Sequence, residues 1–441
     1  MYDNLNLITK GSERKKIMQK LYLTPFNIKT VSLYHQLSRQ GNYVTGFFDG
    51  NSFIHNKTYD GVGIYPRCYV PNAKVIICTT EERTNDIIKN NLMELGYNED
   101  TIEERKEGIL FVNEAESIKV NELLDIFSQA DNMNMGIIED IMKIKKMKEL
   151  GINIENTTYE ELFGLNRKEV FSEKIFLNKF EVIVTNKCSL KCKKCAAGIQ
   201  YIKEPTDLEV EQILSDYDRT IELIDWTDRI VIIGGEPFLN PNLDKVLDGI
   251  FKNPKTIEKV GAVKIITNGT VIPKTSVMDA ISKYGVTVWI SDYGEQSRQM
   301  GELISAFRIA KVNYYVMPTR RWSNVIQLND KKNIQTRDCL LVRRKEGCVT
   351  RCRTMANGKF YLCSLLKTMD YLGISPFSTN DYVDLYDENA REQIMKMLSM
   401  ENPLPNACSF CTGCSEEDWN EAGIDSAEQT KTPLPYIKDR H

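Results

Sequence analysis

The sequence predicts an α/β protein: a partial (β/α) barrel, preceded by a parallel-sheet domain and followed by a small cysteine-rich domain. The first observation behind this prediction is that strand-like and helical segments alternate in two stretches of the 441-residue chain. The second is that seven of the 12 cysteines fall between residues 339 and 414, where apolar runs are short and periodicity is weak. Such a segment is typical of a fold that depends on bound metal.

The N-terminal block, residues 1–125, contains strand-like runs separated by helical ones. We expect strands at Ile28–Tyr34, Tyr43–Phe48, Lys74–Cys78 and Gly108–Val112, and a helix at Glu82–Leu95. Strands that alternate with helices indicate a parallel sheet, because each helix returns the chain to the same end of the sheet. A helical linker over 126–174 then leads to the middle block.

This N-terminal block resembles the Rossmann-like domains of enzymes that make surface polysaccharides. The resemblance rests on a strand that ends in Gly-Phe-Phe-Asp-Gly, residues 46–50, and on the later run Lys-Val-Ile-Ile-Cys-Thr-Thr. It implies that Asp49 stands where a ribose-binding carboxylate often sits. After the first expected strand, however, Tyr34–Gly41 lacks the G-x-G-x-x-G turn that cradles a pyrophosphate. We therefore expect a docking or nucleotide-sugar-recognition role without a bound dinucleotide, and structural roles for Asp49, Cys68 and Cys78.

The middle block, residues 175–325, repeats the alternation of strands and helices more strongly. Five strands are expected at Phe180–Thr185, Arg229–Gly234, Ala262–Thr267, Val286–Ser291 and Asn313–Met317. Helical patterns between them include Leu208–Ile224 and Lys274–Lys283. Five such units predict an open or closed (β/α) barrel, a fold that places its chemistry at the carboxyl ends of the strands.

Three cysteines follow the first of these strands, in the run Cys188-Ser-Leu-Lys-Cys192-Lys-Lys-Cys195. Three thiolates in one loop can hold three corners of a [4Fe–4S] cluster, which normally takes four cysteines. The next cysteine is Cys339, so one iron would stay open to another ligand. A zinc knuckle or a redox thiol group is the alternative. Zinc needs a fourth ligand, and no cysteine or histidine follows at the usual spacing; the histidines are His35, His55 and His441.

Short motifs also stand at the ends of the next three strands. These are Gly234-Gly235-Glu236-Pro237, then Thr267-Asn268-Gly269, then Ser291. In this order, they and the cysteine loop resemble the radical S-adenosylmethionine (SAM) superfamily. The resemblance implies that the glycine turn holds the methionyl amino group of SAM, with Glu236 as an acceptor for that ammonium. It also implies ribose contacts at Thr267, Asn268 and Ser291. One departure is Lys194, which stands where the family often has an aromatic residue.

The same resemblance implies the reaction. SAM would chelate the open iron, and the reduced cluster would donate one electron that cleaves SAM to methionine and a 5′-deoxyadenosyl radical. That radical abstracts hydrogen from the substrate, while the protein positions the reactants and excludes water. A flavodoxin- or ferredoxin-type protein would supply the electron.

The C-terminal block, residues 338–420, carries a second set of cysteines. From Cys348 the sequence reads C-x9-G-x4-C, which is similar to the opening of the SPASM and twitch extensions of radical SAM enzymes. The resemblance implies an auxiliary [4Fe–4S] cluster. The favoured ligands are Cys352, Cys363, Cys408 and Cys411, and the competitors are Cys348 and Cys414. A zinc ribbon on the favoured four is the alternative, because C-x2-C does not identify the metal. The charged tail, 421–441, is expected to be loosely ordered.

Composition excludes several other classes of protein. The net charge is −4, from 57 basic and 61 acidic residues, and no basic patch is interleaved with aromatic residues. Nucleic-acid binding is therefore not expected. The sequence shows no signal peptide and no apolar run of membrane-spanning length, so we expect a cytoplasmic protein whose cysteines are thiols or metal ligands.

The leading hypothesis is a radical SAM enzyme of oxidoreductase or isomerase type, which oxidises, epimerises or rearranges its substrate. The candidate substrates are a nucleotide-linked sugar or surface-glycan precursor, and a ribosomal peptide. Peptide maturases commonly carry a winged-helix leader-binding module, whereas this N-terminal block reads as α/β, which favours the sugar by analogy only. The rival from another class is a non-catalytic iron–sulfur electron carrier or binding protein. The sequence indicates no oligomeric state.

Overall fold

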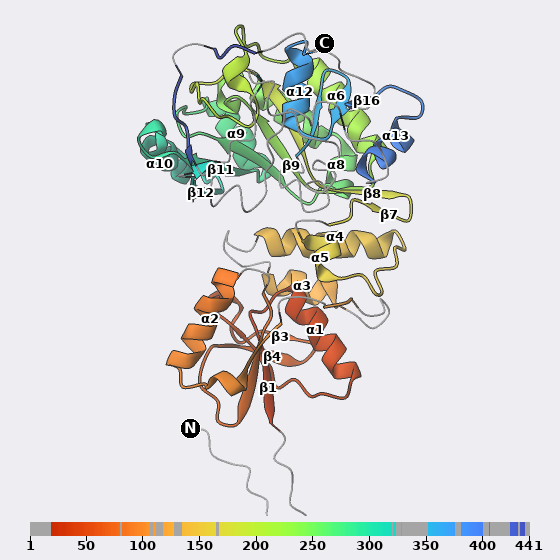
Figure 1. The fold of residues 1–441 in the computed structure, drawn as a ribbon, viewed down its shortest axis with the longest axis vertical. Helices are drawn as coiled ribbons and strands as arrows, with labels where there is room; N and C mark the ends of the chain where they lie inside the picture. The colour runs from red at the N-terminus through yellow and green to blue at the C-terminus, as the bar shows by residue number, and fades with distance from the viewer. Residues whose placement is uncertain are drawn as a thin grey trace, which may run out of the picture. The chain divides into compact units, whose positions relative to one another are not determined.

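The computed structural model describes residues 19–79, 82–105, 109–111, 118–127, 135–164, 167–319, 321–322, 328, 352–374, 381–399, 405, 424–430 and 433–436. The chain forms two compact units, Met1–Gln129 and Ala130–His441, each built around its own β-sheet (Figure 1).

The first unit is a six-stranded sheet with helices packed against it. Its strands are β1 Lys20–Thr24, β2 Gly46–Asp49, β3 Thr58–Tyr59, β4 Val62–Pro66, β5 Ala73–Ile77 and β6 Ile102–Glu104. Its helices are α1 Ile28–Arg39, α2 Glu82–Glu94 and α3 Val120–Phe127. The spatial order is β3-β4-β2-β1-β5-β6, and every neighbouring pair except β3–β4 is parallel. Helix α2 packs through Ile88 and Leu92 on Val75 and Ile77 of the sheet.

The expected first strand, Ile28–Tyr34, is wrong: these residues open helix α1, and the first strand described is β1. Asn27 begins the helix by accepting a hydrogen bond from the Thr30 amide at 2.9 Å. Nine of the twelve helical residues are buried, so the sequence lacks the polar stripe that marks a surface helix. β-branched residues in a fully buried helix therefore read as a strand.

The other elements expected in this unit agree more closely with the structure. The strand expected at Lys74–Cys78 and the helix at Glu82–Leu95 are confirmed by β5 and α2 within one residue at each end. The strand expected at Tyr43–Phe48 exists but begins later, at Gly46. Of the strand expected at Gly108–Val112, the ends lie outside the described residues, and the edge strand beside β5 is β6.

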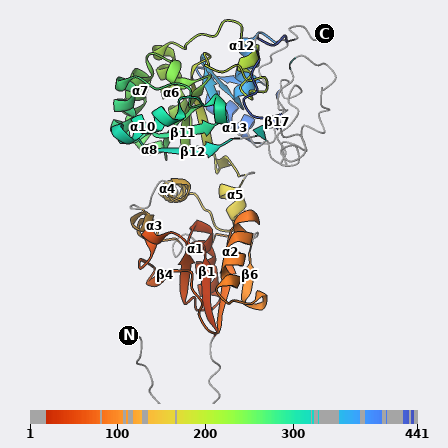
Figure 2. The same ribbon diagram turned by 90° about the vertical axis from the view of Figure 1, so that its left-hand side faces the viewer.

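The second unit contains the five strands expected for the middle block. They are β8 Lys174–Thr185, β9 Trp226–Gly234, β10 Val263–Thr267, β11 Thr287–Asp292 and β12 Tyr314–Pro318. The intervening helices are α6 Val210–Leu223, α7 Leu243–Lys252, α8 Pro254–Lys259, α9 Thr275–Tyr284 and α10 Met300–Ala310. All five strands are parallel in the order β12-β11-β10-β9-β8, with α6 and α7 packed side by side against them (Figure 2). The barrel is open, so the carboxyl ends of the strands form one accessible edge.

The described part of the cysteine-rich block continues this sheet, although a separate metal-dependent domain was expected there. It supplies β14 Arg353–Ala356, β15 Lys359–Tyr361, α12 Ser364–Tyr371, β16 Tyr382–Asp384 and α13 Ala390–Leu398. β14 pairs in parallel with β8, and β15 and β16 follow as antiparallel neighbours. Met355 and Phe360 lie in the same hydrophobic core as Phe180 of β8. The Asn357-Gly358 turn has positive φ at both residues, as a tight hairpin requires.

Part of the expected linker, 126–174, is attached to the second unit. It contains α4 Met135–Glu149, α5 Tyr159–Phe163 and β7 Val170–Phe171, and β7 pairs with β8. From α4, the buried Glu139 carboxylate bonds Arg229 at 2.5 Å and Lys264 at 2.7 Å. Helix α4 is therefore tied by charge to β9 and β10, and is a structural part of the barrel unit.

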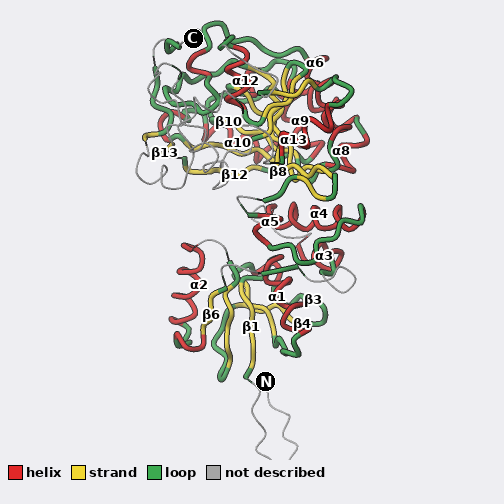
Figure 3. The backbone as a smooth tube through the Cα atoms, turned by 45° about the vertical axis from the view of Figure 1, so that its right-hand side comes forward, coloured by secondary structure: helices red, strands yellow, loops and turns green. Residues whose placement is uncertain are grey.

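The tail also differs from the expectation of loose order. The two-residue strand β13 Arg321–Trp322, labelled in Figure 3, pairs with β17 Ile424–Asp425. The Leu434 amide donates to the Gln200 carbonyl oxygen at 2.8 Å. The described residues 424–430 and 433–436 are thus held against the barrel unit. Within the described ranges, no helix combines the length and apolarity needed to cross a bilayer.

Candidate functional site

The three cysteines expected to hold a cluster lie together at the carboxyl end of β8. Cys188, Cys192 and Cys195 share one hydrophobic cluster with Leu190 and Ala427, and none forms a disulfide. Burial and the neighbouring thiol Cys195 raise the pKa of Cys192 to about 12, and burial raises the pKa of Cys188 and of Cys195. Burial therefore favours the neutral thiols, and a bound cation would favour the thiolates.

Two backbone or side-chain N–H groups lie near the sulfur of Cys188 in this loop. Across the described part of the chain, no three cysteine, histidine or acidic side chains converge to hold a single metal ion. A cubane takes each thiolate on a different iron, so its ligands need not converge on one point. The two N–H groups are the Leu190 amide, 3.4 Å from Cys188 Sγ, and Asn268 Nδ2, 3.6 Å from it. Such donors favour a charged thiolate.

The Gly234-Gly235 turn packs directly on the chain that leads into the cysteine loop. A Cβ on Gly235 would overlap the Lys187 carbonyl oxygen and lie 2.8 Å from Cys188 Cβ. A Cβ on Gly234 would overlap the Thr185 carbonyl oxygen. The Gly235 amide donates to Thr185 O at 3.0 Å, which fixes this close approach. Only glycine fits at both positions.

Glu236 accepts hydrogen bonds from groups at neighbouring strand ends. The side chain is fully buried, and its carboxylate accepts from the Phe238 amide at 3.2 Å, Thr267 Oγ1 at 2.9 Å and the Asn268 amide at 2.9 Å. Burial raises the pKa of Glu236 to about 7. The carboxylate therefore joins the end of β9 to the end of β10, and Pro237 opens the short helical turn that follows.

The ends of β10 and β11 also meet the cysteine loop. Asn268 Nδ2 lies 3.1 Å from Ser189 Oγ as well as near Cys188. Ser297 Oγ donates to Asn268 O at 2.7 Å and to Ser291 O at 3.1 Å. Thr267, Asn268 and Ser291 are all buried. The structure thus brings together every strand-end motif that the sequence singled out in this block.

Two residues at this site were not found from the sequence. Tyr293, just after β11, is half-buried beside the three thiols and stacks edge-on with Trp322 at 5.3 Å between ring centroids. Gln429 Nε2 lies 3.3 Å from Cys192 Sγ. A tyrosine one residue past a strand end is a weak signal, and Gln429 lies in the tail, 237 positions from its partner, where no motif marks it.

Only two of the four favoured auxiliary-cluster ligands are described. The last recorded pair of the β14–β15 hairpin is Thr354 with Tyr361, and Cys352 and Cys363 each lie two residues beyond it. Both thiols therefore stand at the open end of the same hairpin. Burial raises the pKa of Cys352 to about 12. The other favoured ligands and the competitors lie outside the described residues: Cys408, Cys411, Cys348 and Cys414.

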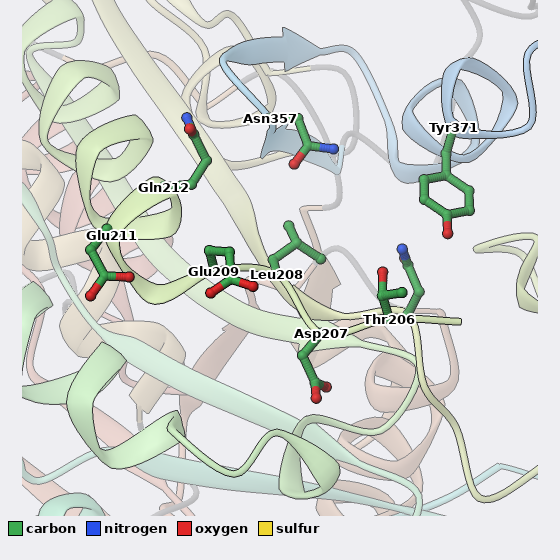
Figure 4. A pocket seen from close by; sticks show the side chains of 9 residues that line it. Thr206, Asp207, Leu208, Glu209, Glu211, Gln212, Asn357 and Tyr371 are labelled. Carbon is green, nitrogen blue, oxygen red and sulfur yellow. The ribbon is translucent and has the colours of Figure 1, made fainter. Parts of the chain in front are cut away.

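An acidic pocket of about 400 Å³ lies at the carboxyl end of β8 (Figure 4). Asp207, Glu209 and Glu211 line it beside Asn186, and Asn357 comes from the β14–β15 turn. The Asp207 carboxylate accepts from Thr185 Oγ1 at 2.7 Å and pairs with Lys187 Nζ at 2.6 Å. Asp207, which lines the pocket, therefore contacts Thr185 and Lys187, just before the cysteine loop.

The turn after β1 in the first unit contains no glycine. The chain there reads Thr24-Pro25-Phe26-Asn27. The Phe26 amide donates to the buried Asp49 carboxylate at 2.8 Å, and the Asn51 amide donates to its other oxygen at 2.7 Å. Asp49 thus holds the turn together, which agrees with the structural role expected for it.

Comparison with known proteins bears on the second unit. The family model described as the Radical SAM superfamily matches residues 182–291, the stretch from β8 to β11 that carries the cysteine loop and the strand-end motifs. This part of the chain is similar to radical SAM domains. The search of curated proteins finds no match.

Similar solved structures include a histidine-tagged form of anSMEcpe with bound AdoMet, which is 20% identical over 32% of this chain and 43% of that chain, with a TM-score of 0.27. Native anSMEcpe with bound AdoMet is 14% identical over 54% and 89%, with a TM-score of 0.37. Streptococcus suis SuiB bound to precursor peptide SuiA is 11% identical over 81% and 87%, with a TM-score of 0.29. This chain spans less than half of the first of these structures.

Proposed function

We propose that this protein is a radical SAM enzyme whose catalytic cluster is held by Cys188, Cys192 and Cys195. The observation that carries the proposal is the hydrogen-bonded junction of the cysteine loop with the glycine turn after β9 and Asn268 after β10. A simple electron carrier needs no such junction at three successive strand ends. The partly or fully buried thiols and the N–H donors near Cys188 and Cys192 fit a thiolate-ligated iron–sulfur cluster.

When bound, a [4Fe–4S] cluster and SAM supply the one-electron cleavage that generates a 5′-deoxyadenosyl radical. The residues of this chain then have separate tasks. The three cysteines hold the cluster, and the turn Gly234–Pro237 presents its backbone to the amino group of SAM. Thr267, Asn268 and Ser291 would contact the ribose. The Glu236 carboxylate keeps two strand ends in register, and Tyr293 with Leu190 excludes water from the sulfurs.

A second, auxiliary [4Fe–4S] cluster completes the proposal, with zinc as the alternative metal. Cys352 and Cys363, both at the open end of the β14–β15 hairpin, would supply two ligands. Cys408 and Cys411 would supply the other two. Full ligation by four thiolates suits electron transfer, so this centre would take the second electron in a net oxidation.

For the substrate, we favour a nucleotide-linked sugar or surface-glycan precursor. The support is the spatial order of the five parallel strands in the first unit, β4-β2-β1-β5-β6. If these strands are numbered one to five along the chain, the order is 3-2-1-4-5, as in doubly wound nucleotide-binding folds. Because its β1 turn is closed by Asp49, we assign this Rossmann-like unit to substrate recognition or docking and not to a bound dinucleotide. A flavodoxin- or ferredoxin-type donor and a reducing, cytoplasmic location belong to the same proposal.

Substrate classes can be separated with the reconstituted enzyme, SAM and a chemical reductant under anaerobic conditions. We expect nucleotide sugars to stimulate formation of 5′-deoxyadenosine above the substrate-free rate, and ribosomal precursor peptides to have no effect. Stimulation by peptides alone would replace the sugar with the alternative, peptide maturation. Incubation with deuterated substrate, followed by mass spectrometry of the deoxyadenosine, would show that hydrogen comes from the added molecule.

A further inference from the structure

We propose that Gln429 is a positioning residue for the cluster loop, carried there by a C-terminal strap, residues 424–430. The inference rests on the proposed function, since it concerns the sulfur of Cys192. Gln429 lies 237 positions from Cys192 in the chain. Its amide stabilises negative charge on the Cys192 sulfur and covers that sulfur from solvent.

The strap is paired with the cysteine loop by its backbone. The Lys193 amide donates to Glu428 O at 2.7 Å, and the Thr430 amide donates to Lys191 O at 2.7 Å. Cys192 and Gln429 therefore face each other as an antiparallel bridge. Backbone pairing fixes the register, so the side chain opposite the cluster ligand is Gln429 and not a neighbour.

The strap also covers the loop with an apolar contact. Ala427 is 1% exposed and packs on Leu190 and Cys192. Its φ is 56°, in the left-handed region that alanine rarely adopts. Such a conformation persists only where the surrounding contacts enforce it. Here the contacts are the pairing of β17 with β13 on one side and the bridge to Cys192 on the other.

The orientation of the Gln429 amide follows from its three partners. Its Oε1 accepts from the Lys191 amide at 2.6 Å. Its Nε2 donates to Cys192 Sγ at 3.3 Å and to Ala427 O at 2.5 Å. A flipped amide would set its oxygen against the sulfur and a carbonyl, and its N–H against another N–H. The amide therefore presents N–H to the sulfur.

An N–H donor at a ligating sulfur stabilises the more negative, reduced state of an iron–sulfur cluster, because it offsets charge on the thiolate. Gln429 consequently makes the cluster easier to reduce. Removing its N–H group should make reduction harder and leave the three cysteine ligands in place.

The test is a redox titration of the reconstituted full-length protein, followed by electron paramagnetic resonance. The signal that changes on addition of SAM identifies the cluster with the open iron, and its potential is measured. For Gln429→Leu, which has similar size and no donor, we expect the reduced-to-oxidised ratio at a fixed potential to fall about tenfold, or about 59 mV for one electron. Gln429→Glu replaces the N–H with an anionic oxygen and should shift the potential at least as far in the same direction.

Glu428→Gln is the matched control. The exposed Glu428 carboxylate pairs with Lys193, so its change perturbs the same strap without touching the sulfur. Removing this negative charge would leave the reduction potential unchanged or raise it. Equal potentials in wild-type protein and both Gln429 variants would overturn the inference. If Gln429→Leu fails to fold, Gln429→Glu decides. A wild-type protein with no SAM-sensitive signal would instead contradict the proposed function.

Discussion

The side-chain amide of Asn268 lies 3.6 Å from the sulfur of Cys188, although 80 residues separate them in the chain. The same nitrogen lies 3.1 Å from Ser189 Oγ, and the Asn268 backbone amide donates to the Glu236 carboxylate. One asparagine thus connects the ends of β8, β9 and β10. The contact explains how a strand-end motif that supplies no cysteine would support the proposed metal centre.

Asn268 gives the first prediction. Asn268→Leu removes the N–H group near Cys188 and Ser189, and we expect SAM cleavage to fall by about 10–100-fold, the usual cost of losing a partner of a metal ligand. The measurement is the rate of 5′-deoxyadenosine formation per cluster, with iron content determined on the same sample. A variant with unchanged rate and iron content would show that the contact has no role in the reaction.

The glycine turn gives a prediction about stability. Gly235→Ala sets a methyl group into the Lys187 carbonyl, and we expect the free energy of unfolding to fall by about 1–3 kcal/mol, as in other overpacked sites. The control is Gly301→Ala, at a position in α10 with open space around it, which should be neutral or stabilising by about 0.5–1 kcal/mol. Urea unfolding of the cluster-free proteins measures both. Equal stabilities would contradict the close packing.

The raised pKa of Glu236 predicts that the free energy of unfolding depends on pH. Its pKa is about 7 in the folded protein, against 4.5 ordinarily. Between these values the folded state binds a proton that the unfolded chain has released, so the contribution of Glu236 to the free energy of unfolding falls as the pH rises. This contribution is fully present below about pH 4.5 and lost as the pH passes through 7. Urea titrations of the cluster-free protein at several pH values should show this slope, and Glu236→Gln should flatten it. The same slope in both proteins would exclude Glu236 as its source.

The auxiliary centre predicts a specific loss of metal. Cys363→Ala should lower the iron content of the reconstituted protein from roughly eight atoms to roughly four, because one complete cluster is lost. Cleavage of SAM should persist, since the loop at Cys188–Cys195 is untouched. Cys68→Ala, at an exposed cysteine of the first unit, is the control and should keep all the iron. Roughly four irons with one zinc in the wild type, and loss of that zinc in Cys363→Ala, would assign the alternative metal.

Much of the barrel unit could be predicted because its signals are local. Each of the five strands is a short apolar run between helical segments, and the motifs at Cys188, Gly234 and Thr267 stand at the strand ends. Parallel topology then brings these ends to one edge without further information. The five strands and the motifs at their ends could be predicted because the local sequence pattern agrees with the overall fold.

The expectations that differ from the structure concern residues whose contacts are made by segments far away in the chain. Ile28–Arg39 is buried on most of its surface by the rest of the first unit, so its sequence shows no helical stripe. Arg353–Ala356 joins the barrel sheet because β8 offers it an open edge, which no pattern near residue 353 reveals. Gln429 reaches Cys192 only because the tail returns to the loop. Long-range pairing of this kind overrides local propensity.

The central claim is that the loop at Cys188–Cys195 holds a cluster that cleaves SAM, and one measurement tests it most directly. The protein is reconstituted anaerobically with iron and sulfide, reduced, and incubated with SAM, and 5′-deoxyadenosine and methionine are quantified beside Cys192→Ala. We predict equal amounts of both products from the wild type and none from the variant, with a wild-type cluster spectrum that changes on addition of SAM. A wild-type protein that binds iron but neither responds to SAM nor cleaves it would contradict the claim and leave an electron carrier.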